Sequence, residues 1–244
     1  MIRITFTPEY IFKIGSFGVS NTIFCSWLAI MFLVVIAFIY FLTLKKHKDK
    51  PNRFQLIVEL LLEKIYNFIH SISRSPKITK MVFPLIATFF LYIVTENLLA
   101  LFPGFLGAFY VKGDANIPLL RSPNSDINAT LALAFISVLS IQYFGIKVLG
   151  FRRYLGRFFS FTNPIKLFLG FFEMFSDLTK VLSLSFRLFG NILAGEILLL
   201  VLAFFTPYFL PLPFLILEIF VGVIQAFIFS TLSLVFIKNA VEKV

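Results

Sequence analysis

The sequence predicts an all-α integral membrane protein with five transmembrane helices, one amphipathic surface helix and a long tilted helical hairpin at its C-terminal end. Its 244 residues are 59% hydrophobic and 14% charged, whereas a soluble chain is about half apolar and about a quarter charged. Apolar runs of about 20 residues, the length that crosses a bilayer, recur along the chain. Dense basic clusters separate several of these runs, as in the cytoplasmic loops of membrane proteins. Residues 1–244 are therefore expected to form a single membrane domain.

The first span is predicted at residues 23–44, an uninterrupted apolar run. A basic cluster follows at residues 45–50, and because such clusters stay in the cytoplasm, residues 1–22 are expected on the outer side. Residues 53–72 differ, since apolar positions spaced by three and four are interrupted by charged and polar ones. That spacing gives a helix with one apolar face. We interpret it as an amphipathic helix that lies on the cytoplasmic surface.

Two further spans flank a polar loop. The second span is predicted at residues 81–102 and carries Glu96 and Asn97 near its far end. Residues 103–126 are rich in Gly, Pro, Asn and Asp and poor in basic residues, as expected of a loop on the outer side. The third span, residues 127–149, returns the chain to a cluster of arginines. The dense basic clusters then all fall on one side of the membrane.

The segment 164–206 is too long for a simple span. It contains no proline after its first residue, and about 42 helical residues would extend about 60 Å, twice the hydrocarbon thickness of about 30 Å. The helix must therefore tilt steeply, emerge from the membrane or break, and Gly190 and Gly195 are candidate bend points. A proline-rich turn leads into the fifth span, residues 211–238, which returns the C-terminus to the cytoplasm.

This long segment carries charges where lipid should exclude them. A charged residue at the centre of a membrane helix costs about 2.5–3.5 kcal/mol on insertion scales, so it is a functional candidate. Separations of 4, 3, 7 and 4 residues place the polar side chains on one helical stripe: Glu173, Asp177, Lys180, Arg187 and Asn191. The first three could instead form a solvated, mutually paired face near the cytoplasmic surface.

Arg187 is harder to explain as a structural residue. No acidic residue lies within helical reach of it, and arginine cannot realistically lose its proton. Its counter-charge must come from water, from another helix or from another protein. Glu196 and Glu218 lie in apolar surroundings on the last two spans, and Gln225 shares a helical face with Glu218. Amides such as Gln225 and Asn191 could simply bond neighbouring helices, but a fixed cation flanked by acids and amides favours a proton path.

Three segments resemble a known family. Residues 185–196, SFRLFGNILAGE, are similar to the signature of subunit a of the F-type ATP synthase. Residues 224–232, IQAFIFSTL, resemble its second signature, and residues 125–130, SDINAT, resemble the start of its third span. Glu173 and Lys180 fall at matching distances before the arginine. The resemblance covers most of the chain from about residue 50.

The resemblance implies a static subunit beside a rotating ring of c subunits, with the b subunits of the peripheral stalk as further partners, in the inner (plasma) membrane of the cell. Arg187 would be the essential arginine between two aqueous half-channels, where it would force an arriving c-ring carboxylate to lose its proton. The proton path would comprise Glu196, Glu218, Gln225, Asn191, Asn97, Glu173, Lys180 and Asp126. Family members often carry a histidine at one of the positions matched by Glu196 and Glu218, and sodium remains an alternative ion.

Other classes fit the sequence less well. The net charge of +10 resides mainly between apolar runs, as membrane topology requires, so nucleic-acid binding is not expected. A secondary transporter would be expected to show two matching halves with broken spans, and no repeat is present. A redox subunit would need His or Cys ligands within the spans, where only Cys25 occurs. No nucleotide-binding Gly-x-x-x-x-Gly-Lys-Ser/Thr loop occurs either, so we expect no catalytic site, cofactor or metal in this chain.

Overall fold

The computed structural model describes residues 10–14, 17–46, 51–101, 110–111, 117–118, 120–158, 164–206 and 210–242. Their helices are α1 (Asn21–Lys46), α2 (Arg53–Ser73), α3 (Pro76–Leu101), α4 (Ile127–Leu149), α5 (Phe151–Phe158), α6 (Pro164–Phe205) and α7 (Pro211–Glu242). Two short antiparallel pairs are also present, β1 (Tyr10–Ile14) with β2 (Phe17–Ser20), and β3 (Tyr110–Val111) with β4 (Ile117–Pro118). Five helices, α1, α3, α4, α6 and α7, are long and apolar enough to cross a membrane. The predicted class, an all-α membrane protein, is confirmed.

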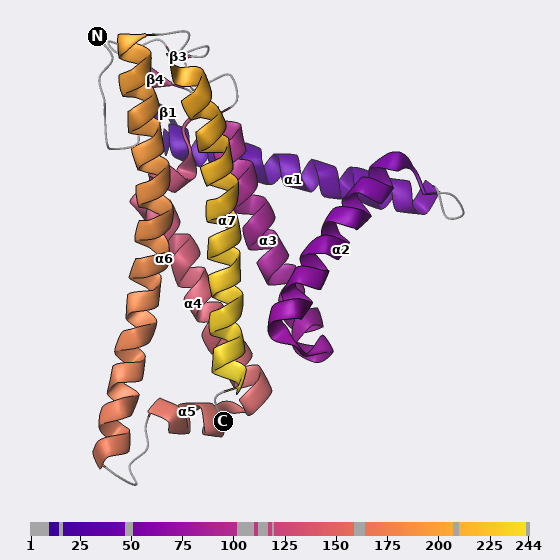
Figure 1. The fold of residues 1–244 in the computed structure, drawn as a ribbon, viewed down its shortest axis with the longest axis vertical. Helices are drawn as coiled ribbons and strands as arrows, with labels where there is room; N and C mark the ends of the chain where they lie inside the picture. Colours follow the sequence, from indigo (N-terminus) through magenta and orange to yellow (C-terminus); the bar gives the residue numbers. More distant parts are fainter. Residues whose placement is uncertain are drawn as a thin grey trace.

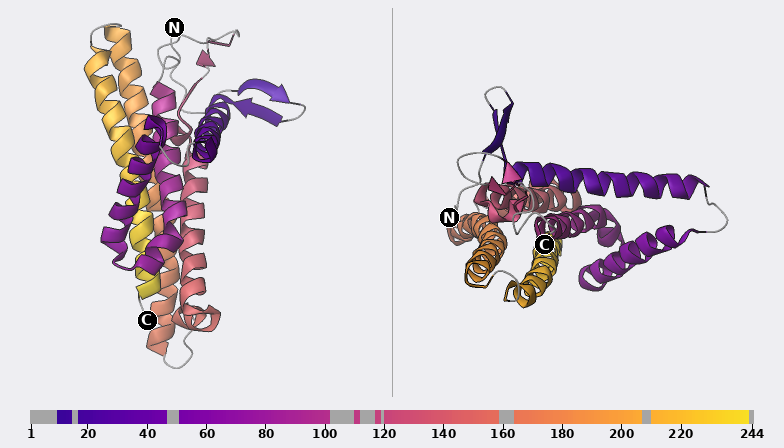
Figure 2. Two further views of the ribbon diagram at one scale, coloured as in Figure 1. Left: turned by 90° about the vertical axis from the view of Figure 1, so that its right-hand side faces the viewer. Right: turned by 90° about the horizontal axis from the view of Figure 1, so that it is seen from above.

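The helices form a bundle with an arm. Figure 1 shows α6 and α7 side by side and antiparallel along the longest dimension, with α3 and α4 packed against them. Helices α1 and α2 extend to one side of this bundle, and the view from above in Figure 2 shows them as a separate arm. Phe89 of α3 meets Phe229 of α7 edge to face, with ring centroids 5.5 Å apart. The core therefore lies among α3, α4, α6 and α7, and it includes Leu188 and Ile141.

Helix α1 is expected to be surrounded by lipid along most of its length. Its buried residues lie only in its first turns, from Asn21 to Ala29, while large apolar side chains such as Val34 and Phe38 are exposed along the rest. A helix that is apolar on all sides and exposed is stable only in an apolar solvent. Since α6 and α7 are steeply inclined to α1 (Figure 1), α1 and the α6–α7 hairpin cannot all follow the membrane normal.

The long helix α6 does not break. It runs without interruption through 42 residues, past both Gly190 and Gly195, and so extends about 60 Å. Of the outcomes that its length allowed, tilting or emergence from the membrane remains. Pro211 then begins α7, a position where proline is favoured because its missing N–H group would have no partner.

The arm helix α2 is amphipathic. Leu56, Ile57, Leu60 and Leu61 are exposed on its first half, which gives it an apolar face that a membrane surface can cover. The helix ends at Arg74, whose φ of 52° is left-handed.

Two elements depart from the expected boundaries. Helix α3 begins at Pro76, ahead of the predicted residue 81, because a proline in the first turn starts a helix well even though the turn is not apolar. Helix α5 was not predicted. The basic residues at 47–50, most of the loop 103–126 and Pro207 lie outside the described residues.

Candidate functional site

Two carboxyl groups predicted for the proton path meet at the end of the bundle where α6 leads into α7. Glu196 of α6 and Glu218 of α7 are 7% and 8% exposed. Gly195 makes their approach possible, because the Glu218 carboxyl group occupies the space that a Cβ atom at Gly195 would fill. We call the site around these two residues the outer acidic site, after the side of the membrane on which the sequence predicts this end of the bundle.

An arginine that sequence reasoning did not single out pairs with one of the two acids of this site. Arg121 Nε donates to Oε2 of Glu196 at 3.2 Å and to Oγ of Ser125 at 3.1 Å. The 3₁₀ helix η1 (Pro123–Ser125) orders this segment, so the guanidinium group is held between a short turn and α6. Oε1 of Glu196 is buried without a hydrogen-bond partner among the described residues. A buried ion pair whose remaining oxygen lacks a donor is costly, which is typical of a functional site.

Amide groups extend the outer acidic site toward α3. Asn97 Nδ2 donates to the carbonyl oxygen of Gly222 on α7 at 3.0 Å, and Asn124 Nδ2 donates to Oδ1 of Asn97 at 2.8 Å. Asn97, Glu196 and Glu218 help to line a cavity of about 10 Å³. A cavity needs about 10–15 Å³ to hold a water molecule, so this one has room for about one. The predicted residues Asn97, Glu196 and Glu218 are thus brought together.

Asp126 caps the N-terminus of helix α4. It is the N-cap of α4, where Oδ1 accepts a hydrogen bond from the backbone N–H of Asn128 at 2.9 Å. Oδ2 accepts a longer bond of 3.5 Å from Thr22 at the start of α1. The side chain therefore starts one helix and ties it to another.

Arg187 lies on an exposed face of α6. Its one hydrogen bond among the described residues is a 3.5 Å contact from Nη2 to Oγ of Ser183, and it forms no ion pair within that part of the chain. Ser183, Gly190 and Ala194 are exposed on the same face, and a Cβ atom at Gly190 would meet open space. Small residues leave room for a partner helix to approach closely. The arginine thus projects from a narrow surface toward the outside of the chain.

Asn191 and Gln225 connect this face to the interior. Asn191, one turn after Arg187, is exposed and donates from Nδ2 to Oε1 of Gln225 at 2.8 Å. Gln225 on α7 is 2% exposed. The pair joins the two helices of the hairpin beside the arginine, as amides in membranes commonly do.

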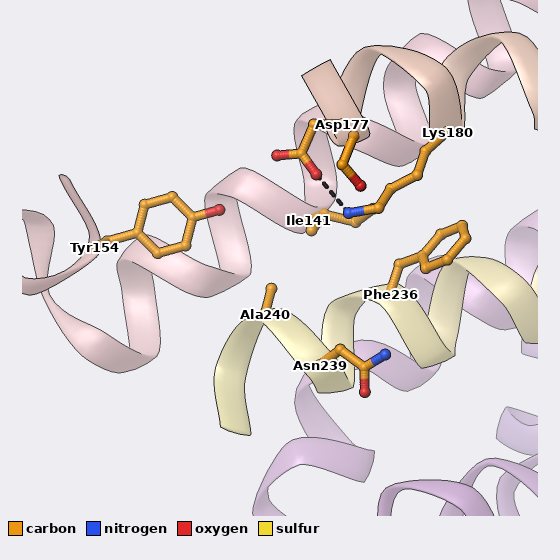
Figure 3. Close-up of a pocket in the computed structure, with 8 residues that line it drawn as sticks. Ile141, Tyr154, Asp177, Lys180, Phe236, Asn239 and Ala240 are labelled. Carbon is orange, nitrogen blue, oxygen red and sulfur yellow. Dashed lines mark hydrogen bonds and ion pairs between the residues drawn. The ribbon is translucent and has the colours of Figure 1, made fainter. Parts of the chain in front are cut away.

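A second polar site lies toward the opposite end of the bundle. A cavity of about 140 Å³ opens between α4, α5, α6 and α7, lined by Ile141, Tyr154, Ser176, Asp177, Lys180, Phe236, Asn239 and Ala240 (Figure 3). Lys180 Nζ forms an ion pair with Asp177 across one helical turn and lies 5.2 Å from the centre of the Phe236 ring. This site is large enough for several water molecules. We call it the inner cavity, after the cytoplasmic side on which the sequence predicts this end of the bundle.

Polar partners from other helices fix the acid of the inner cavity. Gln142 Nε2 of α4 donates to Oδ2 of Asp177 at 2.7 Å, and the Tyr154 hydroxyl donates to Oε1 of Gln142. A Cβ atom at Gly145 would collide with the Tyr154 ring, so glycine there lets α5 pack onto α4. Glu173, which was predicted together with Lys180, is half-buried one turn before Asp177 on α6 and does not line the cavity.

The polar residues that sequence reasoning left out of the site share one property: each has at least one hydrogen-bond partner that is distant in sequence. They are Arg121, Ser122, Asn124, Gln142 and Tyr154. Arg121 and Glu196 are 75 positions apart, and Gln142 and Asp177 are 35 apart. Arg121 is one of two basic residues in the loop 103–126, with Lys112, and this was the only sequence signal for it. Among the described residues, no group of three or more His, Cys, Asp or Glu side chains could hold a metal ion.

The fold and these sites define a multi-pass membrane protein with an arginine exposed on its longest helix and polar sites toward both ends of its bundle. Comparison with known proteins narrows the class. Residues 23–238 match the family of the ATP synthase A chain, and the chain belongs to that family. It is 30% identical over 237 residues to ATP synthase subunit a of Legionella pneumophila strain Philadelphia 1, covering 97% of this chain and 93% of that one. It is 32% identical over 238 residues to ATP synthase subunit a of Moorella thermoacetica, covering 96% and 97%.

Proposed function

We propose that this chain is the static, proton-conducting subunit of the membrane sector of a rotary ATP synthase, with Arg187 at the boundary between an outer and an inner proton path. The chain would carry no catalytic site of its own. Protons would load and leave carboxyl groups on a ring of c subunits that passes Arg187, and their flow would turn the ring. Membership of the ATP synthase A chain family supports this proposal.

The position of Arg187 is the observation that carries the proposal. A permanent cation exposed on a helix of a membrane protein is costly unless a partner supplies negative charge. The described residues place no acid beside it, and the small side chains around it leave room for a neighbouring helix. A carboxyl group of a c subunit would meet both requirements. In its charged form it would pair with Arg187, which therefore favours loss of its proton.

The outer acidic site would deliver protons to the ring. Glu196 and Glu218 are carboxyl groups on the two helices of the hairpin, and Asn97 helps to line the cavity beside them. Asn191 and Gln225 connect the interior of the hairpin with the face of Arg187. Carboxyl groups next to a cavity of water size can accept and pass on protons.

The inner cavity would belong to the exit path on the cytoplasmic side, as predicted for Lys180 and Glu173. Its volume of about 140 Å³ and its Asp177–Lys180 pair support a hydrated region. Lys180 points into this cavity in Figure 3. We therefore propose that Lys180 acts within the chain rather than against the ring.

The proposed orientation places residues 1–22 outside and the C-terminus in the cytoplasm. Lys238 near the end of α7 donates from Nζ to the carbonyl oxygen of Ile72 at 2.9 Å, so the end of α7 lies beside the corner that carries Arg74 and Lys77. Basic residues from these two distant parts of the sequence would then face the cytoplasm, as the positive-inside rule requires. Peripheral-stalk b subunits would hold the chain against the turning ring.

The test is Arg187→Ala in the whole complex in membrane vesicles, with ATP synthesis and ATP-driven proton pumping measured together. Both activities should be lost while the complex remains assembled, because the carboxyl groups of the ring lose the cation that controls their charge. Arg53→Ala, which removes an exposed arginine of α2, is the matched control and should retain both. Wild-type synthesis or pumping in Arg187→Ala would contradict the proposal.

A further inference from the structure

A third buried carboxyl group lies near the outer acidic site and has no role in the path described so far. Glu96 of α3 is 1% exposed. Its Oε1 accepts a hydrogen bond from Oγ of Ser26 on α1 at 3.2 Å, and its Oε2 is buried without a hydrogen-bond partner among the described residues. Tyr92 and Asn124 are its other polar neighbours.

Glu96 of α3 links the bundle to α1 of the arm through its hydrogen bond with Ser26. The next residue on α3, Asn97, bonds to α7 and accepts from Asn124, whereas Glu96 bonds to Ser26 of α1. Cys25 on α1 lies close enough to interact electrostatically with both Glu96 and Glu196. The two carboxyl groups thus lie on two different helices, both within electrostatic range of one residue of α1.

Burying a carboxylate in this position costs free energy unless the group binds a proton or a water molecule. One ordinary hydrogen bond does not compensate for removing a carboxylate from water. Its second oxygen therefore needs a proton or a water molecule, and Oδ1 of Asn124 nearby is likewise buried without a partner. Two unsatisfied acceptors beside each other favour a route along which water and protons move. A residue needed only to hold α1 in place could be an amide, which would bond Ser26 without charge.

We infer that Glu96 is a proton-carrying residue of the outer path, positioned between α1 and the outer acidic site. This inference rests on the proposed function and extends it. A proton from water on the outer side binds an oxygen of the Glu96 carboxylate, and the same carboxyl group then releases a proton inward toward Glu196, which regenerates the carboxylate. The titratable side chains that interact with it are Tyr92 on its own helix and Cys25 on α1, and Cys25 in turn interacts with Glu196 on α6.

The test is Glu96→Gln in the whole complex, reconstituted in vesicles, with ATP synthesis driven by a fixed proton gradient while the pH of the outer side is varied. Glutamine keeps the size and can bond Ser26 but cannot carry a proton. Synthesis should fall several-fold, and its dependence on outer pH should flatten. Glu63→Gln removes an exposed carboxyl group on α2 and should leave both the rate and the pH profile unchanged.

A wild-type rate and pH profile in Glu96→Gln would overturn the inference. Arg187→Ala in the same vesicles separates this failure from failure of the proposed function. If Arg187→Ala abolishes synthesis, only the inference about Glu96 fails. If Arg187→Ala retains synthesis, the proposed function itself is contradicted. Should Glu96→Gln fail to assemble, Glu96→Asp decides, because it keeps a carboxyl group but moves it back by one methylene. A shifted pH profile in assembled Glu96→Asp supports the relay, and an unchanged profile overturns it.

Discussion

Two arginines of this chain lie in opposite environments. The Arg121 side chain is 12% exposed, and it bonds Glu196 and Ser125 within the outer acidic site. Arg187 is exposed on α6, and among the described residues only Ser183 hydrogen-bonds to it. Their charge is the same, and both lie in a protein for which lipid is the main solvent.

The difference teaches how the two charges are compensated. Arg121 has its counter-ion within the chain, so it should serve stability and the position of Glu196. Arg187 has none among the described residues, so its counter-ion should belong to another molecule. Local sequence does not separate these cases, because neither arginine has an acid within one helical turn. The tertiary contacts distinguish the two arginines, because in the described part of the chain only Arg121 has an acid from a distant part of the sequence beside it.

Replacement by lysine should separate the two arginines most strongly. Arg187→Lys should not restore full coupling, because a compact ammonium group can lose its proton when it is buried against a partner. Arg121→Lys should keep most of the ATP synthesis rate, since a lysine can still pair with Glu196 and loses mainly the bond to Ser125. Synthesis and proton pumping in vesicles measure both. A wild-type rate in Arg187→Lys would remove the distinction.

Removal of the charge should affect stability in only one of the two. Arg121→Gln leaves Glu196 buried beside an uncharged group, and breaking a buried pair in this way costs about 3–5 kcal/mol. The double variant with Glu196→Gln should recover most of that loss, because no charge then remains unpaired. Heating the purified complex and following release of the chain measures the effect. Arg187→Ala is the comparison and should leave the release temperature unchanged, and additive losses in the double variant would argue against the pair.

The acids of the outer acidic site should control proton entry. Glu196→Gln and Glu218→Gln should each slow proton flux several-fold without opening a leak, because Arg187 still separates the two paths. Flux into vesicles, with and without ATP, distinguishes slow entry from leakage. Glu242→Gln removes an exposed carboxyl group at the end of α7 and should have no effect. Unchanged flux in both single variants and in the double variant would count against their role.

Sequence reasoning recovered the features that depend on local pattern. Long apolar runs identified the five apolar helices, and the absence of proline after residue 164 predicted a helical segment of about 42 residues, because each depends on neighbouring residues alone. The sequence left open whether that segment breaks at Gly190 or Gly195, and the structure shows one continuous helix. The start of α3 was misplaced because its first turn is polar. Arg121 was missed for a different reason, since its pairing with Glu196 depends on how the outer loop folds back onto α6.

The smallest expected effect concerns Asp126, which the resemblance assigned to the proton path and which the structure uses to cap α4. Asp126→Ala should cost about 1 kcal/mol of stability, the usual value of a lost N-cap, and Asp126→Asn should cost little because asparagine caps equally well. If Asp126 only caps α4, proton flux stays at the wild-type level in Asp126→Asn. Asparagine cannot carry a proton, so a matching loss of flux in both variants would return Asp126 to the proton path. Proton flux and release temperature measured on the same complexes separate capping from conduction at this residue.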